Sequence, residues 1–238
     1  MIVLQRANRS SRVYYLSHRQ GQYNRVMPIK YKKLRLEALS VAPTSFSSSY
    51  EIKSSLPDNE WVNPLPENKR ETFICAARPT QDNLSDSQIP EQSIWVGQLT
   101  LRGLQRLEAF ILPEESGQKK PGEEDQGLWQ MLTLVTLPNH RGRGLGKRLC
   151  QDALNYLASY QASPRELWVR LMAKPENHAT VSLYLGPELV EAGKCTLAGA
   201  LVANGGKDLP TEYIGGEKYA SRSGLIMMLE SCRSSVIC

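Results

Sequence analysis

Apolar positions recur along this chain in two rhythms, and each rhythm predicts a kind of element. Short, nearly continuous apolar runs predict strands, and they lie at 71–77, 94–101, 129–137, 167–172 and 224–229. Apolar residues at three- and four-residue spacing predict a helix, and this spacing is clearest at Leu145, Leu149, Ala153, Leu154 and Leu157. The first residues, 1–6, have the character of a further strand.

The order of these elements predicts an α+β fold with a mixed, mostly antiparallel central sheet flanked by helices. The 238 residues suffice for a single well-cored domain, which we expect to span 1–238. Segments 78–93 and 113–126 are rich in Pro, Gly, acidic and polar residues, which predicts solvent-exposed insertions between strands. Segment 203–223, with its paired glycines, is expected to form a long loop between the last two strands.

Composition narrows the class of protein. The five cysteines are widely spaced and form no Cys-x-x-Cys pair, which predicts reduced thiols in a cytoplasmic protein without a metal site. No apolar stretch approaches the roughly 20 residues of a membrane span, so we expect no membrane partner. Segment 6–25 is interpreted as a loop beside the first helix, with a transit peptide as the lesser alternative. The net charge of +5 comes without a nucleic-acid-binding signature, so we expect no nucleic-acid partner.

The most informative stretch joins the apolar strand that ends near 137 to the helix that begins near 145. Its glycines, at 142, 144 and 146, are interspersed with the basic residues Arg141, Arg143 and Lys147. A helix N-terminus offers unpaired backbone N–H groups and the positive end of the helix dipole, and glycines let a phosphate approach those groups. The layout therefore predicts a pyrophosphate site.

Two common phosphate-binding motifs do not fit this turn. A dinucleotide fingerprint counted from Gly142 requires a third glycine where Lys147 stands. A P-loop requires glycine in place of Arg141 and Ser or Thr in place of Arg148. What remains is the pattern Arg141-x-x-Gly144-x-Gly146, or else a glycine-rich turn with a solvated basic face.

The pattern resembles the Arg/Gln-x-x-Gly-x-Gly/Ala signature of the GNAT superfamily of acyl-CoA-dependent N-acyltransferases. Segments 31–39 and 42–51 resemble the family's first helix and the turn after it, and 177–184 is similar to its Asn-x-x-Ala-x-x-Leu-Tyr segment. These matches follow the family's order over roughly residues 30–230. On these residues the chain is identified as a member with the acyl-CoA N-acyltransferase fold.

The resemblance implies acetyl-CoA as the co-substrate. Its pyrophosphate would lie on the turn, and its pantetheine would lie along the end of the preceding strand, bonded to main-chain groups like an added β-strand. A backbone N–H at this strand end would also face the oxyanion of the reaction. The residues so implied in cofactor binding are Val135, Thr136, Leu137, Arg141, Gly142, Arg143, Gly144, Leu145, Gly146, Lys147 and Asn177.

The resemblance also implies that Tyr184 protonates the departing thiolate, the alternative being an aromatic ring packed against the sheet. Asn177 would contact the pantetheine or a water, cap the helix, or do both. The family's usual Gly-Phe after this helix is replaced here by Leu185-Gly186-Pro187-Glu188.

The general base is not marked in the sequence. Many relatives carry a glutamate on the strand before the turn, where this chain has the residues Leu-Trp-Gln-Met at 128–131, and the nearest upstream carboxylate is Asp125. Ordered water is one candidate for the general base. Tyr50 and Glu51, after the first helix, are further candidates for the base and are expected on the substrate side, against the plainer interpretation of a surface glutamate.

The expected function is that of an N-acetyltransferase, a monomer or homodimer, that acts on a primary amine of a small molecule or a protein. The alternative is an acyl-CoA-binding regulatory module with the same fold and little transferase activity. The missing strand glutamate and Gly-Phe favour the module, whereas the intact turn and Tyr184 favour the enzyme. A nucleic-acid-binding protein is the least favoured class. The identity of the acceptor cannot be predicted from the sequence.

Overall fold

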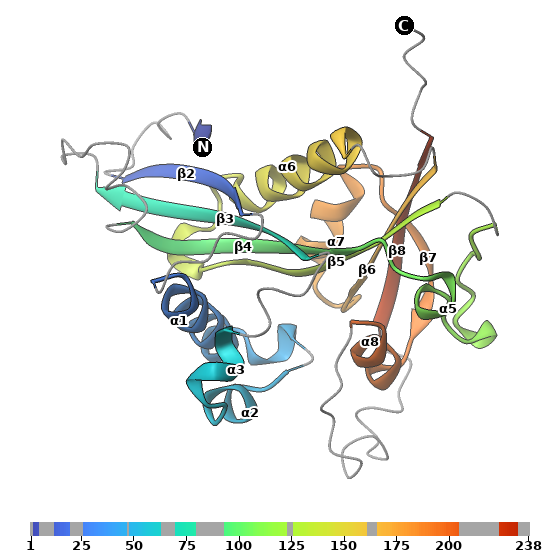
Figure 1. Cartoon of the computed structure of the whole chain (residues 1–238), viewed down its shortest axis with the longest axis horizontal. Helices are drawn as coiled ribbons and strands as arrows, with labels where there is room; N and C mark the ends of the chain where they lie inside the picture. The colour runs from blue at the N-terminus through green and yellow to red at the C-terminus, as the bar shows by residue number, and fades with distance from the viewer. Residues whose placement is uncertain are drawn as a thin grey trace, which may run out of the picture. The chain divides into compact units, whose positions relative to one another are not determined.

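A computed structural model describes residues 2–4, 12–19, 26–46, 48–62, 70–79, 93–122, 126–160, 166–204 and 224–232. Figure 1 shows its helices and strands. In chain order they are β1 Ile2–Leu4, β2 Arg12–Arg19, α1 Val26–Val41, η1 Pro43–Ser45, α2 Tyr50–Ser54, α3 Asp58–Val62, β3 Arg70–Pro79, β4 Ile94–Gly103, α5 Leu107–Phe110, η2 Glu114–Ser116, β5 Gln126–Thr136, η3 Pro138–His140, α6 Leu145–Ser159, β6 Glu166–Ala173, α7 His178–Leu185, β7 Val190–Cys195, α8 Leu197–Ala203 and β8 Gly224–Cys232.

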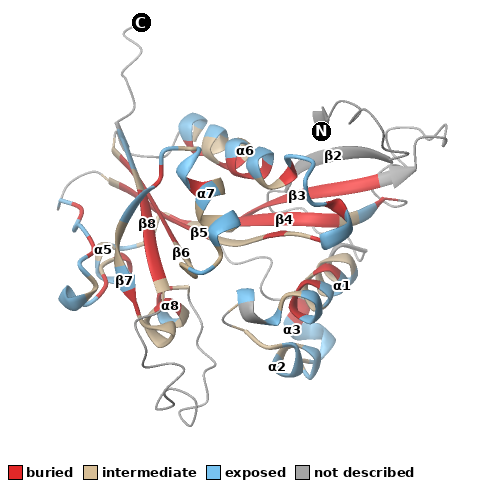
Figure 2. Ribbon diagram, turned by 180° about the vertical axis from the view of Figure 1, so that it is seen from behind, coloured by how far each residue is buried: buried red, intermediate tan, exposed pale blue. Residues whose placement is uncertain are grey.

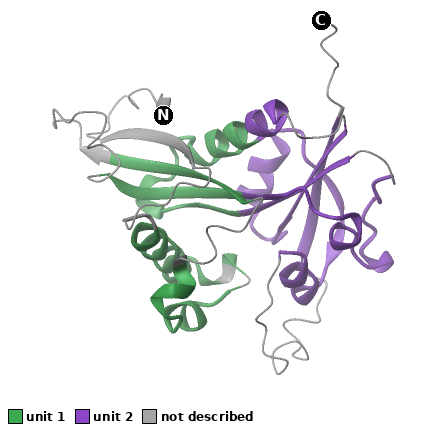
Figure 3. Cartoon of the chain, viewed as in Figure 1, with its two compact units in different colours: residues 1–100, 133–153 green, residues 101–132, 154–238 purple. Residues whose placement is uncertain are grey.

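The chain divides into two compact units, shown in Figure 3. Unit 1 comprises Met1–Thr100 and Thr133–Ala153, and unit 2 comprises Leu101–Leu132 and Leu154–Cys238. The division falls within β4, β5 and α6, so each of these elements contributes residues to both units. A single domain over 1–238 stays a prediction.

In unit 1 the strands follow the order β1-β2-β3-β4-β5. Strands β2 and β3 pair antiparallel from Arg12↔Pro79 to Arg19↔Thr72. Within this unit α6 covers one face of the strands, and α1, α2 and α3 lie on the other (Figure 1). The contact with α6 is close, because a Cβ atom placed on Gly97 of β4 would lie 3.4 Å from Cδ1 of Leu149.

The core of unit 1 follows from the apolar patterns of its elements. The α6 stripe is buried at Leu145, Leu149 and Ala153, as the three- and four-residue spacing predicts. Residues 71–77 of β3 are buried without alternation, which is the pattern of a strand covered on both faces (Figure 2). Helix α1 adds Leu34, Ala38 and Leu39.

In unit 2 the strands follow the order β4-β5-β6-β8-β7. Strands β5 and β6 are parallel, from Gln126↔Glu166 to Gln130↔Arg170, whereas β8 pairs antiparallel with both β6 and β7. The strands and the short helices α5 and α8 share an apolar cluster, formed by Phe110, Leu112, Leu128, Trp168, Cys195, Ala200, Ala203, Ile226 and Met228.

The predicted fold class, a mixed and mostly antiparallel sheet flanked by helices, is confirmed. The interpretation of 6–25 as a loop is wrong for residues 12–19, which form β2. Its centre, Val13 to Leu16, is β-branched, aromatic and aliphatic, and pairing with β3 outweighs the flanking polar residues. The residue range of strand β7, which precedes segment 203–223, was not predicted, because Gly193 and charged residues interrupt its apolar pattern.

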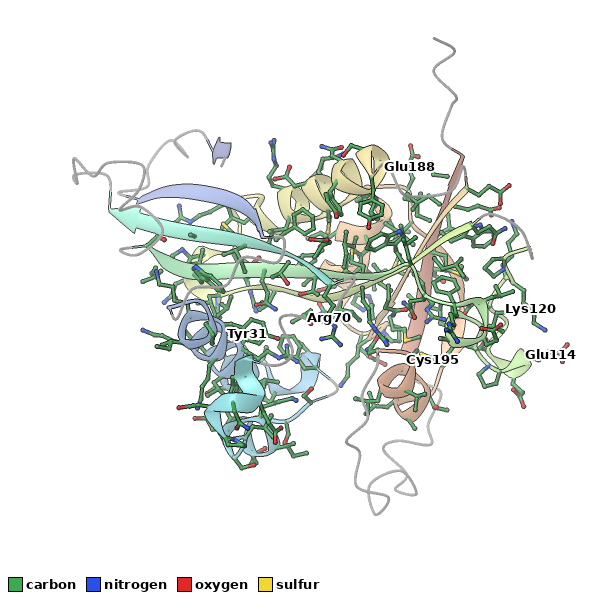
Figure 4. The ribbon with its side chains drawn as sticks, in the orientation of Figure 1. Tyr31, Arg70, Glu114, Lys120, Glu188 and Cys195 are labelled. Carbon is green, nitrogen blue, oxygen red and sulfur yellow. The ribbon has the colours of Figure 1, made fainter. Side chains whose placement is uncertain are left out.

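The predicted insertions are only partly exposed. In segment 113–122, Glu114 and Lys120 project outward from unit 2 (Figure 4), but Gln118 and Pro121 are buried. Gln118 is buried because its Nε2 donates to the Phe110 carbonyl oxygen at 3.3 Å. Residues 78–79 belong to β3, while 80–92 lie outside the described residues, as do 123–125 and 205–223.

Cys75, Cys150 and Cys195 are buried free thiols, as predicted, while nothing is described of the Cys232 side chain or of Cys238. Among the described residues, no group of His, Cys, Asp and Glu side chains is placed to hold a metal ion. No described helix is both long and apolar enough to cross a bilayer.

Candidate functional site

The turn between β5 and α6 has the backbone geometry that its glycines predict. Gly142 and Gly144 have φ of +71° and +73°, in the left-handed region where a side chain is strained. A Cβ atom added to either residue would meet no atom within 4 Å. The glycines are therefore required by the path of the backbone, and the space beside them is open to a ligand.

The turn ends in backbone donors that make no backbone hydrogen bond with any described residue. Helix α6 makes its first backbone bond from the Arg148 N–H to the Gly144 carbonyl oxygen, at 3.0 Å. In the described part of the chain, the preceding N–H groups that donate no backbone bond are those of Gly142, Gly144, Leu145, Gly146 and Lys147. The side chains of Arg143 and Lys147 are exposed beside them. Partial positive charge from the helix end and full charge from these side chains both favour an anion at this turn.

Two hydrogen bonds fix the turn to the strands of unit 1. Arg141 Nε donates to the Thr136 carbonyl oxygen at 2.9 Å, and the Leu137 N–H donates to the Val96 carbonyl oxygen at 2.8 Å. The Leu137 N–H is thus engaged with β4. Because alternate residues of a strand direct their main-chain groups to opposite edges, the Thr136 N–H and the main-chain groups of Leu134 point away from β4.

The end of β5 is locally irregular. Thr133 has a φ of +55°, which is rare for a residue with a branched side chain and marks a kink just before Leu134. The parallel register of β5 on β6 ends at Gln130↔Arg170, so Met131 and Leu132 have no register partner in β6. A Cβ atom on Gly97 would lie 3.0 Å from the Val135 carbonyl oxygen, so glycine allows β4 and β5 to approach closely here.

In unit 2, α7 carries Asn177 and Tyr184. Asn177 Oδ1 accepts a hydrogen bond from the Thr180 N–H at 3.3 Å, which confirms its role as the N-cap. Tyr184 is 6% exposed, and it is the buried residue of a helix that is otherwise exposed or half-exposed. Its role as an acid and the contact of Asn177 with pantetheine stay predictions.

The segment after α7 differs from the family pattern in a defined way. The helix ends at Leu185, and the Glu188 N–H donates to the Leu185 carbonyl oxygen at 3.1 Å. Glu188, labelled in Figure 4, has a φ of +69°. The turn thus closes the helix within a few residues, and Leu189 enters the core.

Tyr50 and Glu51 begin α2 in unit 1, and both are exposed. Ser49 caps this helix by accepting from the Ile52 N–H at 3.3 Å. The backbone N–H of Glu51, together with the Ser49 hydroxyl, holds the pKa of the Glu51 carboxyl below its usual range. A carboxylate with a lowered pKa is a weak proton acceptor, so its environment does not favour Glu51 as a general base.

The sequence reasoning missed Arg170, which lies fully buried on β6 beside Gln130 of β5. Arg170 Nε donates to Gln130 Oε1 at 2.7 Å. Gln130 stands in the stretch where many relatives have a glutamate, and its side chain is an amide engaged with a cation. The signal was present in the sequence, because Arg170 interrupts the apolar run 167–172.

Comparisons with known proteins agree with this geometry. Residues 95–186 match the model of the acetyltransferase (GNAT) family. No match to the chain is found among curated proteins. Among solved structures, the chain is similar to NAA60 of Arabidopsis thaliana in complex with a bisubstrate analogue, at 13% identity over 91% of this chain and 99% of that chain, with a TM-score of 0.52.

Two further solved structures share the fold. One is an acetyltransferase of the GNAT family from Streptococcus pneumoniae, at 14% identity over 92% of this chain and 100% of that chain, with a TM-score of 0.50. The other is the ribosomal-protein-S5-alanine acetyltransferase from Vibrio fischeri, at 10% identity over 99% of this chain and 98% of that chain, with a TM-score of 0.52. At these identities the likeness is one of fold.

Proposed function

We propose that this chain, a member of the GNAT superfamily of acetyltransferases, transfers an acetyl group from acetyl-CoA directly to a primary amine. The observation that carries the proposal is the set of backbone N–H groups of Gly142, Gly144, Leu145, Gly146 and Lys147, which donate no backbone bond within the described part of the chain. A row of such donors at the start of α6 fits a pyrophosphate, which is the part of coenzyme A that carries two adjacent negative charges. The basic side chains Arg143 and Lys147 would add to its binding.

The residues of β5 fit the pantetheine that follows the pyrophosphate. The Thr136 N–H and the main-chain groups of Leu134 point away from β4 and can pair with the amides of an extended ligand. One of these N–H groups would also donate to the thioester oxygen, where a fixed donor contributes a few kcal/mol to catalysis. Val135 and Leu137 would hold the strand in place, because the Leu137 N–H is already bonded to Val96.

In the proposed reaction the nitrogen of a neutral amine forms a bond to the carbonyl carbon as the carbon–sulfur bond breaks. The Tyr184 hydroxyl gives its proton to the departing thiolate and regains one from solvent. The nitrogen loses its extra proton to ordered water, because Gln130 is an amide and the Glu51 carboxyl has a lowered pKa. The burial of Tyr184 on α7 supports its proposed role as the proton donor.

The acceptor is proposed to be a primary amine of a small molecule or a protein. The Vibrio fischeri structure is an acetyltransferase named for an alanine of ribosomal protein S5, which supports a protein acceptor within this fold. Tyr50 and Glu51 are exposed on α2 and are proposed to contact the acceptor rather than to remove its proton.

The second candidate, an acyl-CoA-binding regulatory module, is favoured by Gln130. An amide bonded to Arg170 takes the place of the carboxylate that many relatives use. A module would bind coenzyme A through the same turn but would release no thiol.

The experiment that separates the two is a free-thiol release assay with acetyl-CoA across polyamines, aminoglycosides, amino acids and peptides, with mass spectrometry of the products. An enzyme releases thiol only when an amine is present, and the amine gains an acetyl group. Coenzyme A binding with no release across the panel would support the module. The matched control is the same protein without an amine, which measures spontaneous hydrolysis.

A further inference from the structure

Strand β7 is the edge strand of unit 2. It comes last in the order β6-β8-β7, so β8 is its single neighbour in the described sheet. Among the described residues, no loop or turn makes a main-chain hydrogen bond to β7. Val190, at its start, is 61% exposed, although Met228, its partner on β8, is buried. An edge of this kind offers main-chain donors and acceptors to a further strand.

A β-bulge in β7 changes which of its side chains share a face. Glu191 pairs with Met227 of β8. Lys194 pairs with Leu225, and Ala192 is the extra residue between the two pairs. Residues three apart on a regular strand point to opposite faces, but Met227 and Leu225 are two apart and point to the same one. The bulge thus places the exposed residues Glu191 and Lys194 on one face of the sheet.

The same register sets the direction of the main-chain groups. Opposite residues of an antiparallel pair either bond to each other or both direct their N–H and C=O groups away. Because the β8 partners of Glu191 and Lys194 are two apart, both residues direct these groups to the same edge of β7. Val190 and Cys195 match each other in the same way, since their β8 partners are four apart. The two halves of β7 are therefore complementary in charge, face and main-chain direction.

From these observations we propose that β7 pairs antiparallel with β7 of a second copy of this chain, around a twofold axis at the bulge. The pairing places Glu191 opposite the partner's Lys194, and Val190 opposite the partner's Cys195. Both members of each pair lie on one face, as antiparallel neighbours must. The symmetry repeats each contact, so two Glu–Lys pairs form. The proposed pairing does not depend on acetyl transfer.

The other symmetric registers that keep neighbours on one face are less favourable. One places Lys194 opposite the partner's Lys194, and another places Glu191 opposite the partner's Glu191, so that like charges meet. A third, which pairs Val190 with the partner's Gly193, leaves the end of the strand unpaired. The proposed register uses all six residues of β7. It places Ala192 opposite the partner's Gly193 at the centre, where the small residues let the strands approach.

Two features of β7 bear on whether a second copy can reach its edge. A lysine on an edge strand commonly repels a further strand, but here the partner's Glu191 would compensate the charge of Lys194. The η2 segment packs close to β7, because a Cβ atom on Gly193 would collide with the Ser116 carbonyl oxygen. The Cβ atom of a strand residue points to a face of the sheet, so this contact lies on a face and not along the edge.

The experiment is sedimentation velocity over a concentration series, with Tm as the check on folding. Because only one six-residue strand of each copy pairs, we expect a reversible dimer with a Kd of about 1 μM to 1 mM. Glu191→Lys and Lys194→Glu each place like charges opposite in both pairs, and each should raise this Kd about tenfold or more. Glu37→Lys, at an exposed position of α1 in unit 1, makes the same change in net charge as Glu191→Lys and should leave the Kd unchanged.

A mixture of the two variants gives the sharpest readout. The Glu191→Lys copy carries lysine at both positions and the Lys194→Glu copy carries glutamate at both. The two should therefore form a heterodimer about as tightly as the wild type forms its dimer, and contacts within one copy cannot produce this rescue. A wild type that stays monomeric at about 1 mM would overturn the inference. A dimer whose Kd neither variant changes, or a mixture without heterodimers, would overturn it as well.

Discussion

Arg141 Nε donates to the carbonyl oxygen of Thr136 at 2.9 Å and so ties the start of the glycine turn to the end of β5. The two residues are five positions apart, and η3 forms the chain between them. The bond gives the arginine of the turn a structural role that the phosphate-site pattern alone does not predict. It fixes where the turn leaves the strand, and therefore where its free N–H groups point.

Arg141→Met is expected to weaken coenzyme A binding about tenfold, because one hydrogen bond from a charged donor is lost. Arg141→Gln should recover part of the affinity, since its amide can donate to Thr136. Isothermal titration of coenzyme A checks both. Arg148→Met is the matched control, because Arg148 pairs with Asp152 on the exposed side of α6 at 3.0 Å. Equal losses in the Met variants at 141 and 148 would mean that charge alone matters.

Gly144→Val is expected to abolish the Tm shift by coenzyme A, because a branched side chain would occupy the open space beside the turn. The strain of a side chain at positive φ costs about 1–2 kcal/mol and lowers the stability as well. Gly117→Val separates the two effects, since Gly117 has a φ of +69° and open space but lies after η2 in unit 2. An unchanged ligand shift in Gly144→Val would place the cofactor elsewhere.

Tyr184→Phe is expected to lower turnover ten- to a hundredfold or more, with little change in coenzyme A affinity. The variant removes a proton donor and keeps the buried ring. Tyr160→Phe serves as the control. It removes a hydroxyl from a ring that packs edge-on against Trp129, directly after the end of α6. If turnover is unaltered while chemistry is rate-limiting, Tyr184 is a packing residue and the proton comes from water.

Burial raises the pKa of the Cys75 and Cys150 thiols to about 12. Because the folded protein holds these protons more tightly than the unfolded chain, their contribution to stability is full below about pH 8.5 and is lost as the pH rises toward 12. The free energy of unfolding in urea should fall by about 1.4 kcal/mol per pH unit for each thiol in that window. Replacing both cysteines with alanine should flatten this slope, and an identical slope would contradict the assignment.

The strands and the turn could be predicted from the sequence because their signals are local. The runs 71–77 and 167–172 are continuous and apolar, and Gly142 and Gly144 stand where the backbone needs positive φ. Strand β2 could not be predicted, because its apolar centre is short and flanked by polar residues, and the strand is stabilised by pairing with β3 along its length. Such pairing depends on residues about sixty positions away.

The polar network around Arg170 could not be predicted for a similar reason. Gln118, Gln130 and Arg170 come from three separate segments, and only the folded chain brings their side chains together. Gln118 lies in a segment whose composition predicts exposure, yet it is buried by its bonds to Phe110 and Arg170. Composition reports the average of a segment and not the residue that anchors it.

The most direct test of the pyrophosphate site is amide hydrogen exchange of the ¹⁵N-labelled protein with and without saturating coenzyme A. The N–H groups of Gly142, Gly144, Leu145, Gly146 and Lys147 have no backbone partner in the described structure, so they should exchange quickly in the free protein. Coenzyme A should slow them by about tenfold or more, while Gly117 stays unchanged. Unaltered exchange at these five groups with coenzyme A bound would contradict the proposed site.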